Sequence, residues 1–341
     1  MNNKKIFIIF ILIFIFFISK NIYCQDNAKV YVIKKLEFQE INRWYAAYIK
    51  KAIKKASDEG ASLIILELDT PGGLLSSALS IKNYIIESDI PVVAYINKNA
   101  LSAGALISLS CEAIYMSDGS IIGAATPVYM KGGNIEKASE KEISAMRAAM
   151  RSSAERSKKN VRAAEAMVDE TIILTKSKDG IDLDDKTLLT LSLEEALKVN
   201  IADAKANSII EIIKLRNLSE NSTIKNVEEE KYDYILRFLI NPAVLSALIS
   251  IGIIGVYIEL KTPGFGIGGV ISIIAFSIFF FAQIFVGDSG FLSPAIFLLG
   301  IVLLAIEIFV IPGFGITGIL GILGIVAGIF MSFGINNIAQ A

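Results

Sequence analysis

The C-terminal third of this 341-residue chain constrains its architecture more than any other feature. Only four charged side chains follow residue 238, and they are Glu259, Lys261, Asp288 and Glu307. Four apolar stretches occupy this region, at residues 238–258, 267–286, 291–310 and 316–333. Each is close to the roughly 20 residues that an α-helix needs to cross a bilayer. The sequence therefore predicts an α-helical membrane domain of about four spans over residues 238–341.

A short motif repeats within the predicted membrane domain. Glu259 precedes the sequence Pro-Gly-Phe-Gly-Ile at 263–267, and Glu307 precedes the same sequence at 312–316. Proline and glycine at corresponding span ends indicate two related pairs of helices joined by tight turns. The pattern itself assigns no role to the two glutamates.

Residues 1–24 have the pattern of a secretory signal peptide. Lys4 and Lys5 provide a basic start, and the apolar run of thirteen residues from Ile6 to Ile18 is short for a spanning helix. Cleavage after Cys24 is the favoured interpretation, and an uncleaved anchor or a lipidated Cys24 are the alternatives. In each case we expect the next domain to be exported. The turn around Lys261 then faces the cytoplasm, as the positive-inside rule prefers.

Residues 25–215 form the charged middle of the chain, and the polar, acidic residues 216–237 are interpreted as a linker. Within the middle, strands are predicted over 29–38, 63–68, 91–96 and 113–116. Helices are predicted over 42–56, 74–87, 102–109, 141–159, 161–174 and 192–199. Apolar strands separated by helices indicate βαβ units and a mostly parallel sheet that helices cover. The middle domain is therefore predicted to be α/β.

The chain contains no histidine and only two cysteines, Cys24 and Cys111. A Ser-His-Asp triad, a Cys-His dyad and a histidine-ligated metal are thereby excluded, and two cysteines cannot build a zinc site. The 33 basic and 34 acidic residues nearly balance, so no basic surface for nucleic acid is expected. Catalysis would use Ser, Thr, Lys, Asp, Glu, Tyr or backbone groups, and needs no metal or organic cofactor.

The segment DTPGG at residues 69–73 follows a predicted strand and precedes a predicted helix. Its two glycines allow backbone amides to turn towards a ligand, and the helix adds its positive end. Amides placed in this way can stabilise a carbonyl oxygen as it becomes an oxyanion. A simple turn is the alternative, and it is the commoner use of Pro-Gly-Gly.

Ser102 follows the strand predicted over 91–96 and stands at the start of a helix. This position exposes its hydroxyl at the carboxyl edge of the sheet, where ligands bind in α/β folds. Capping the helix is the ordinary role of such a serine. The small neighbours Ala100, Ala103 and Gly104 permit a close backbone approach that a cap does not require. Ser102 is therefore a candidate nucleophile.

A serine nucleophile needs a base, and histidine is absent. A lysine can serve where an apolar pocket keeps its amine neutral. The candidates between Ser102 and the linker include Lys131, Lys137, Lys141, Lys158 and Lys159. Taken alone, each is typical of a solvated surface charge, and spacing does not choose among them.

Four segments occur in the order seen in ClpP-class serine proteases. They are ELDTPGG at 67–73, ALSAGALIS at 100–108, AIYMSDGSIIGAATPV at 113–128 and LSLEEALKVNIAD at 191–203. Followed by the predicted spans, they resemble the long form of the membrane-anchored NfeD proteins, which is associated with stomatin operons. The resemblance covers nearly the whole chain from residue 25 onward.

Two departures accompany this resemblance. Long NfeD proteins usually continue into a small β-barrel of the OB type, and we expect this chain, whose sequence ends at Ala341, to be without it. The stretch Asn97-Lys98-Asn99 also differs, because a glycine is common there in the family.

The resemblance implies a ClpP/crotonase-like fold and a Ser-Lys dyad. Ser102 matches the family's nucleophile, and the similar helix end at residues 157–160 places the family's lysine at Lys141. Ser102 would attack the scissile carbonyl, and Lys141, neutral in a mostly apolar pocket, would take its proton. The amides of Gly73 and Ala103 are the expected oxyanion hole.

Gly72 is expected to leave space for the turn beside the expected oxyanion hole, because glycine has no side chain. The segment 126–140, which contains Gly132 and Gly133, is predicted to be a mobile flap over the site. A disordered surface loop is the alternative for this segment.

The resemblance also implies partners. These are a stomatin-like membrane protein with an apolar segment as substrate, membrane lipid and, as a candidate, a second copy of this chain. Two other classes of protein compete with the peptidase. A crotonase-type acyl-CoA enzyme is disfavoured by export, since acyl-CoA is cytoplasmic. The stronger rival is a non-catalytic membrane scaffold that keeps the fold.

Overall fold

The computed structural model describes residues 28–34, 40–131, 134–184, 186–262, 266–285, 290–310 and 315–333. The predicted signal peptide lies outside these residues. The chain divides into two compact units, of which the first comprises residues up to Ile41 together with Ile49–Glu228, and the second comprises Asn42–Tyr48 together with the residues from Glu229. Each unit has an apolar core of its own.

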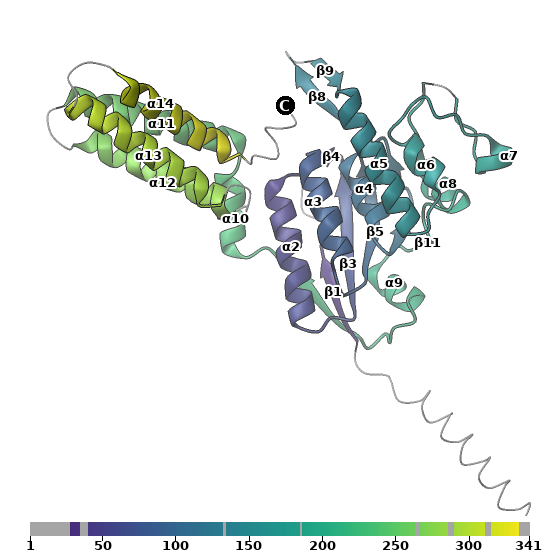
Figure 1. The fold of residues 1–341 in the computed structure, drawn as a ribbon. Helices are drawn as coiled ribbons and strands as arrows, with labels where there is room; N and C mark the ends of the chain where they lie inside the picture. Colours follow the sequence, from purple (N-terminus) through teal and green to yellow (C-terminus); the bar gives the residue numbers. More distant parts are fainter. Residues whose placement is uncertain are drawn as a thin grey trace, which may run out of the picture. The chain divides into compact units, whose positions relative to one another are not determined.

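A mostly parallel sheet organises the first unit (Figure 1). Its eight described strands are β1 (Lys29–Ile33), β3 (Leu63–Thr70), β5 (Val92–Leu101), β6 (Ala113–Met116), β7 (Ile121–Gly123), β10 (Thr190–Ser192), β11 (Ala204–Lys205) and β12 (Thr223–Val227). The main order is β10-β7-β5-β3-β1-β12, and β6 and β11 pair beside β5. Only β10 runs antiparallel to its neighbour β7. The predicted α/β class is confirmed.

Helices lie across both faces of this sheet. They are α2 (Arg43–Asp58), α3 (Leu75–Ile86), α4 (Ala103–Ser110), α5 (Glu140–Arg156), α6 (Val161–Ala166), α7 (Lys176–Asp179), α8 (Leu193–Lys198) and α9 (Ile209–Leu215). Figure 1 shows α2, α3, α4 and α5 in front of the strands. On the other face, Ile212 and Ile213 of α9 pack against strand residues such as Ile65. Burial on both faces explains why Leu63–Leu66 in β3 are all apolar.

Two segments, at residues 161–174 and 216–237, differ from their predicted structure. The helix predicted over 161–174 ends at Ala166, because the carbonyls of Met167 and Val168 bond instead to the segment at residues 125–126. The expected linker at 216–237 contains β12, which pairs with β1, and helix α10 (Lys231–Leu239). Its polarity reflects an edge strand whose side chains are mostly exposed.

The segment expected as a flap contains a two-stranded hairpin. Strand β8 (Val128–Lys131) pairs antiparallel with β9 (Asn134–Lys137), and the tip at 132–133 lies outside the described residues. The amide of Ala138 donates to the carbonyl of Pro127 at 3.0 Å and closes the base of the hairpin. Ser139 and Glu142 then form a capping box that starts α5 directly after it.

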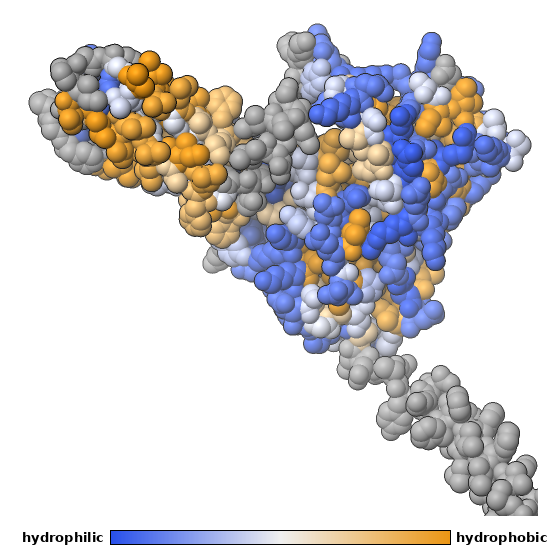
Figure 2. All heavy atoms as spheres, viewed as in Figure 1, coloured by the Kyte–Doolittle hydropathy of each residue, from blue (hydrophilic) through white to orange (hydrophobic). Residues whose placement is uncertain are grey.

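After α10, the second unit continues as a bundle of apolar helices: α11 (Pro242–Lys261), α12 (Ile267–Phe285), α13 (Leu292–Phe309) and α14 (Ile316–Met331). Figure 2 shows that the face of this bundle in view is largely apolar. Two helices, α11 and α12, are long and apolar enough to cross a membrane, whereas α13 and α14 are shorter apolar helices. The structure thus supports a helical membrane region with two candidate spans.

The repeated glutamates have a structural role at the turns of this bundle. Glu259, near the end of α11, accepts the amides of Gly266 and Gly269 with its two carboxylate oxygens, each at 2.7 Å. Glu307, near the end of α13, likewise accepts from the amide of Gly315 and the hydroxyl of Thr317. Each carboxylate therefore caps the following helix from the preceding one, where amides would otherwise lack an acceptor.

Small residues complete the repeat. Gly252 and Gly300 each stand seven residues before the capping glutamate. A Cβ on Gly252 would lie 2.6 Å from the ring of Phe276, and one on Gly300 would lie 2.5 Å from the backbone nitrogen of Ile325. Phe276 and Ile325 are equivalent, since each follows its Gly266 or Gly315 by ten residues. The membrane region is therefore built from two copies of one helical hairpin.

Replacing Glu259 with glutamine should destabilise the helical region. Glutamine keeps one acceptor oxygen but turns an NH₂ group towards a backbone amide, so one charged cap is lost at a cost of about 1–3 kcal/mol. Lys261→Gln in the same turn is the matched control and should change little. Thermal unfolding of the full chain in detergent measures both; equal midpoints for the two variants would contradict the capping role.

Candidate active site

The long strand β5 delivers Ser102 to the carboxyl edge of the sheet. Residues Val93–Ile96 pair with β6, and residues Asn99–Leu101 pair with β7, so the strand continues beyond its predicted end to the residue before Ser102. Ser102 itself has φ 53° and ψ −118°, a conformation that a side-chain-bearing residue rarely adopts. Although it occupies the N-cap position of α4, its side chain makes no capping hydrogen bond. The hydroxyl is therefore not used as a cap.

Gly72 lies directly against the side chain of Ser102. A Cβ on Gly72 would lie 2.5 Å from the Ser102 Cβ and 3.0 Å from its Oγ, and the φ of Gly72 is +122°. Only glycine fits this position. The Thr70 hydroxyl supports the turn, because the Gly72 amide donates to it at 3.1 Å.

The amides of Gly73 and Ala103 flank this contact. The short strands β2 (Glu40–Ile41) and β4 (Gly72–Gly73) pair in parallel, and the Ile41 carbonyl accepts from the Leu74 amide at 2.7 Å. In this register the Gly73 amide points away from the ladder. Ala103 is the first residue of α4, so its amide has no acceptor within that helix. Both amides therefore lie beside Ser102 without serving the regular structure of their own elements.

Four polar side chains join the strands at this edge, a pairing that was not predicted from the sequence. The Asn97 side chain donates to Glu67 at 2.5 Å, and the Asn99 side chain donates to Asp69 at 3.1 Å. These two pairs join β3 to β5 just before the DTPGG turn and Ser102. Polar residues at alternate positions on both strands were the available signal. No group of three or more Cys, Asp or Glu side chains arranged to hold a metal occurs in the described part of the chain.

Gly123 connects Ser102 to the helix that carries Lys141. The Ser102 amide donates to the Gly123 carbonyl at 2.9 Å. Pro127 follows Gly123 by four residues, which span about 13 Å when the chain is extended. Its carbonyl accepts a hydrogen bond from the amide of Ala138, and the next residue is the N-cap of α5. Lys141 is the second residue of α5 and is exposed. The apolar pocket expected around Lys141 is therefore not formed by the described residues of this single chain.

Ion pairs hold the middle of α5 and the hairpin against residues 165–170. Lys137 pairs with Glu170 at 2.5 Å, Arg151 pairs with Glu165 at 3.2 Å, and Arg147 pairs with Asp169. Hydrogen bonds from Thr171, with the Arg147 charge, hold the pKa of Asp169 below its usual range despite partial burial. Lys137 is thus already paired, which makes it a poorer base than the sequence alone indicated.

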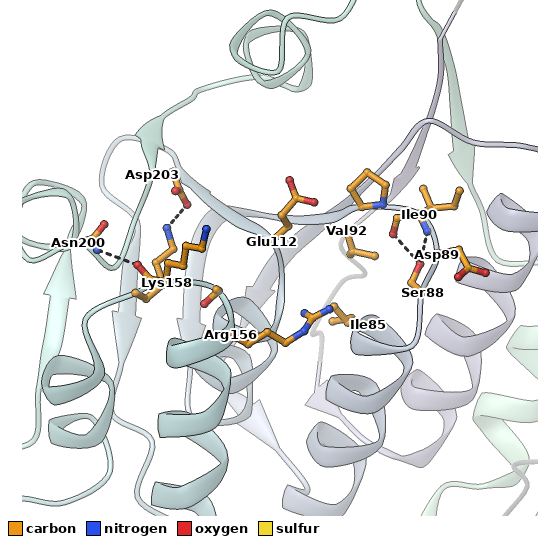
Figure 3. Close-up of a pocket in the computed structure, with 13 residues that line it drawn as sticks. Ile85, Ser88, Asp89, Ile90, Val92, Glu112, Arg156, Lys158, Asn200 and Asp203 are labelled. Atoms are coloured by element: carbon orange, nitrogen blue, oxygen red, sulfur yellow. Dashed lines mark hydrogen bonds and ion pairs between the residues drawn. The ribbon is translucent and has the colours of Figure 1, made fainter.

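Lys158 and Lys159 lie at the opposite end of α5 from Lys141, about 25 Å away along the helix axis. Both line a polar cavity of about 660 Å³, together with Glu112, Arg156 and Asp203. Figure 3 shows Lys158 and these three side chains. The Lys159 side chain is only 2% exposed and is paired with Asp203. This cavity adjoins Val92, at the amino end of β5, whereas Ser102 follows its carboxyl end. Neither lysine therefore belongs to the Ser102 site.

Solved structures of a membrane-bound stomatin-specific protease, 1510-N, resemble this chain. A serine-to-alanine mutant is 28% identical with a TM-score of 0.50, over 60% of this chain and 99% of that one. A lysine-to-alanine mutant in complex with a substrate peptide is 27% identical with a TM-score of 0.52, over 63% and 98%. The chain therefore combines an α/β domain of this membrane-protease fold with an apolar helical region.

Family models match both parts of the chain. The NfeD1b N-terminal domain matches residues 29–227, and the NfeD integral membrane domain matches residues 243–341. Membrane protein NfeD1b of Bacillus subtilis is 35% identical over 315 residues, which are 91% of this chain and 69% of that protein. Membrane-bound protease PH1510 of Pyrococcus horikoshii is 28% identical over 82% of this chain and 64% of that protein. The chain belongs to the NfeD family of membrane proteins.

Replacing Gly72 with alanine tests the packing at Ser102. The added methyl group would crowd the serine, and we expect destabilisation of about 1–3 kcal/mol. Gly119→Ala is the matched control, because Gly119 also has a positive φ but no atom lies within 4 Å of its Cβ position. Thermal unfolding is measured for both. Equal unfolding midpoints for the two variants would show that this contact is not tight.

Proposed function

We propose that this chain is a membrane-anchored serine endopeptidase that cleaves apolar segments of membrane-associated proteins with a Ser102–Lys141 dyad. The observation that carries the proposal is the conformation of Ser102. Its strained backbone, its uncapped helix start and its contact with Gly72 together cost stability and serve no evident structural purpose. Such a conformation is typical of a nucleophile held for attack.

The choice of Lys141 rests on position and on a relative. In the 1510-N protease the serine and lysine replaced in the solved mutants are 41 positions apart. Among the lysines after Ser102, Lys141 comes nearest to this separation, at 39 positions. Lys137 and Lys159 already have carboxylate partners. Lys141 lies in the first turn of α5, the helix that follows the β8–β9 hairpin.

The chemistry follows that of other Ser-Lys enzymes. The neutral amine of Lys141 takes the proton of Ser102 as its oxygen attacks the scissile carbonyl, and then passes that proton to the leaving amine. The amides of Gly73 and Ala103 stabilise the oxyanion. Water then hydrolyses the acyl-enzyme with Lys141 again as the base. No step requires a metal or an organic cofactor.

An apolar substrate would supply the cover that Lys141 lacks in the single chain. Three large apolar side chains beside the site are unusually exposed: Leu74 at 48%, Val128 at 56% and Tyr129 at 47%. Leu74 directly follows Gly73, and Val128 and Tyr129 lie on β8. An apolar peptide bound across them would bury these groups and remove water from the amine. The apolar segment of a stomatin-like membrane protein fits this description.

The exposure of Lys141 is also consistent with one alternative to the peptidase. A non-catalytic scaffold with the same fold would need Ser102 and Gly72 only for shape, and would not need a neutral amine at Lys141. The two functions differ in whether a peptide bond is broken, so cleavage decides between them.

Loss of peptide cleavage is expected in three variants of the dyad. Ser102→Ala removes the nucleophile, Lys141→Ala removes the base, and Lys141→Arg replaces it by a group that stays protonated. Each should lower cleavage of an apolar peptide by roughly a thousandfold or more while the domain stays folded. The readout is cleavage by the full chain in detergent, with circular dichroism as the check on folding.

Two lysine controls accompany these variants. Lys137→Ala and Lys158→Ala should retain cleavage, because the first removes an exposed ion pair and the second lies at the far end of α5. Activity lost in Lys137→Ala but kept in Lys141→Ala would move the base to Lys137. Cleavage by Ser102→Ala would overturn the peptidase function itself.

The proposed topology places the α/β domain outside the cytoplasm and gives the membrane domain four spans. In a chain whose native cysteines are replaced by alanine, Asn221→Cys should react with an impermeant maleimide in intact cells. Asn221 is exposed on the first unit, so access to the residue is not limited by folding. Lys261→Cys, at the first turn between spans, should react only after permeabilisation. The reverse pattern would invert the topology.

A further inference from the structure

Helix α10 carries an exposed apolar stripe just before the first candidate span. Tyr234, Ile235 and Phe238 are 54%, 60% and 64% exposed. Their spacing of one and four residues places them on one side of the helix. The opposite side is buried, with Asp233 at 4% and Leu236 at 7% exposed. The outward face of α10 is therefore the apolar one, the reverse of a helix on the surface of a soluble domain.

The start of α11 and the end of α12 lie next to α10, and they indicate its depth relative to the membrane. Only Ile240 and Asn241 separate α10 from the first residue of α11. On α10, the Tyr232 ring packs edge-on against Phe285, the last residue of α12, with ring centres 6.5 Å apart. The start of α11 and the end of α12 lie at the same end of their antiparallel hairpin. Helix α10 is thus located where both candidate spans reach one surface of the membrane.

Helix α10 cannot itself continue the span. Its nine residues would cover about 14 Å against a hydrocarbon core of about 30 Å. Asn241 has extended backbone angles and Pro242 opens α11, so the chain changes direction between the two helices. Arg237 is held at the polar boundary, where it pairs with Glu229 at 3.1 Å and lies over the Tyr234 ring at 5.3 Å. Tyrosine and arginine side chains are typical of membrane interfaces.

We propose that α10 is an interfacial helix that lies along the bilayer surface, with Tyr234, Ile235 and Phe238 inserted at the boundary between headgroups and acyl chains. The partner is phospholipid, because only two residues separate the stripe from α11, a helix long and apolar enough to cross a membrane. An exposed apolar helix face at this level is covered by acyl chains once the neighbouring span is inserted. This role does not depend on the catalytic activity.

Spin-label accessibility of the full chain in phosphatidylcholine–phosphatidylglycerol vesicles tests the proposal. Single cysteines at Ile235 and Phe238, in the chain without native cysteines, carry a nitroxide. Both positions are exposed, so labels there should not disturb the fold. Collisions with oxygen, which concentrates in the bilayer, are compared with collisions with a water-soluble nickel chelate. Asn221→Cys, on the exposed surface of the first unit, is the matched control.

The labels at Ile235 and Phe238 should favour oxygen over nickel, and the label at Asn221 should favour nickel. An oxygen-to-nickel ratio at Ile235 and Phe238 equal to that at Asn221 would show a helix in water and overturn the proposal. Shielding of these labels from both reagents would also overturn it, since a protein partner or a second copy would then cover the stripe.

Discussion

The close packing of Gly72 against Ser102 is the contact on which the candidate site depends. It holds β4, just after β3, directly against the residue that precedes α4. The same junction is tight at Gly104, where a Cβ would lie 2.6 Å from a methyl carbon of Thr70. Backbone amides and one hydroxyl thus share a small space at the sheet edge. The site is built chiefly from main-chain geometry, which suits stabilisation of a developing oxyanion.

Much of the fold could be predicted because its signals are local. Residues Leu63–Leu66 and Ala113–Met116 are apolar on both faces of their strands, and the capped helices begin close to their predicted starts. The carboxyl half of β5 was missed because Asn97 and Asn99 look like a loop. Their amides are satisfied only by Glu67 and Asp69 on another strand. Such tertiary pairing cannot be inferred from a local pattern.

The candidate site was predictable to different degrees. Ser102 and Gly72 each lie in a short motif. The local backbone that surrounds them is determined by those motifs, so both residues could be predicted. Lys141 was placed through family resemblance, and the pocket expected around it is absent from the described single chain. Burial of a residue on a helix's first turn depends on whatever packs over it. The spacing of residues along the chain does not show whether a substrate or a second copy of the chain packs over Lys141.

The membrane region follows the same logic with a different solvent. Unpaired amides cost more among apolar neighbours than in water, so the starts of α12 and α14 need acceptors. Glu259 and Glu307 supply them from the preceding helices. The repeated motif was visible in the sequence, but its purpose appeared only when the carboxylates and the glycine amides were seen together.

Covalent trapping of Ser102 distinguishes a peptidase from a scaffold. The full chain is treated with an acylating serine-hydrolase probe, and the modified residue is identified by peptide mass spectrometry. We expect one adduct on Ser102, formed much more slowly when Lys141 is replaced by alanine. A folded chain that remains unmodified at Ser102 would contradict the peptidase function and leave the scaffold as the function of this fold.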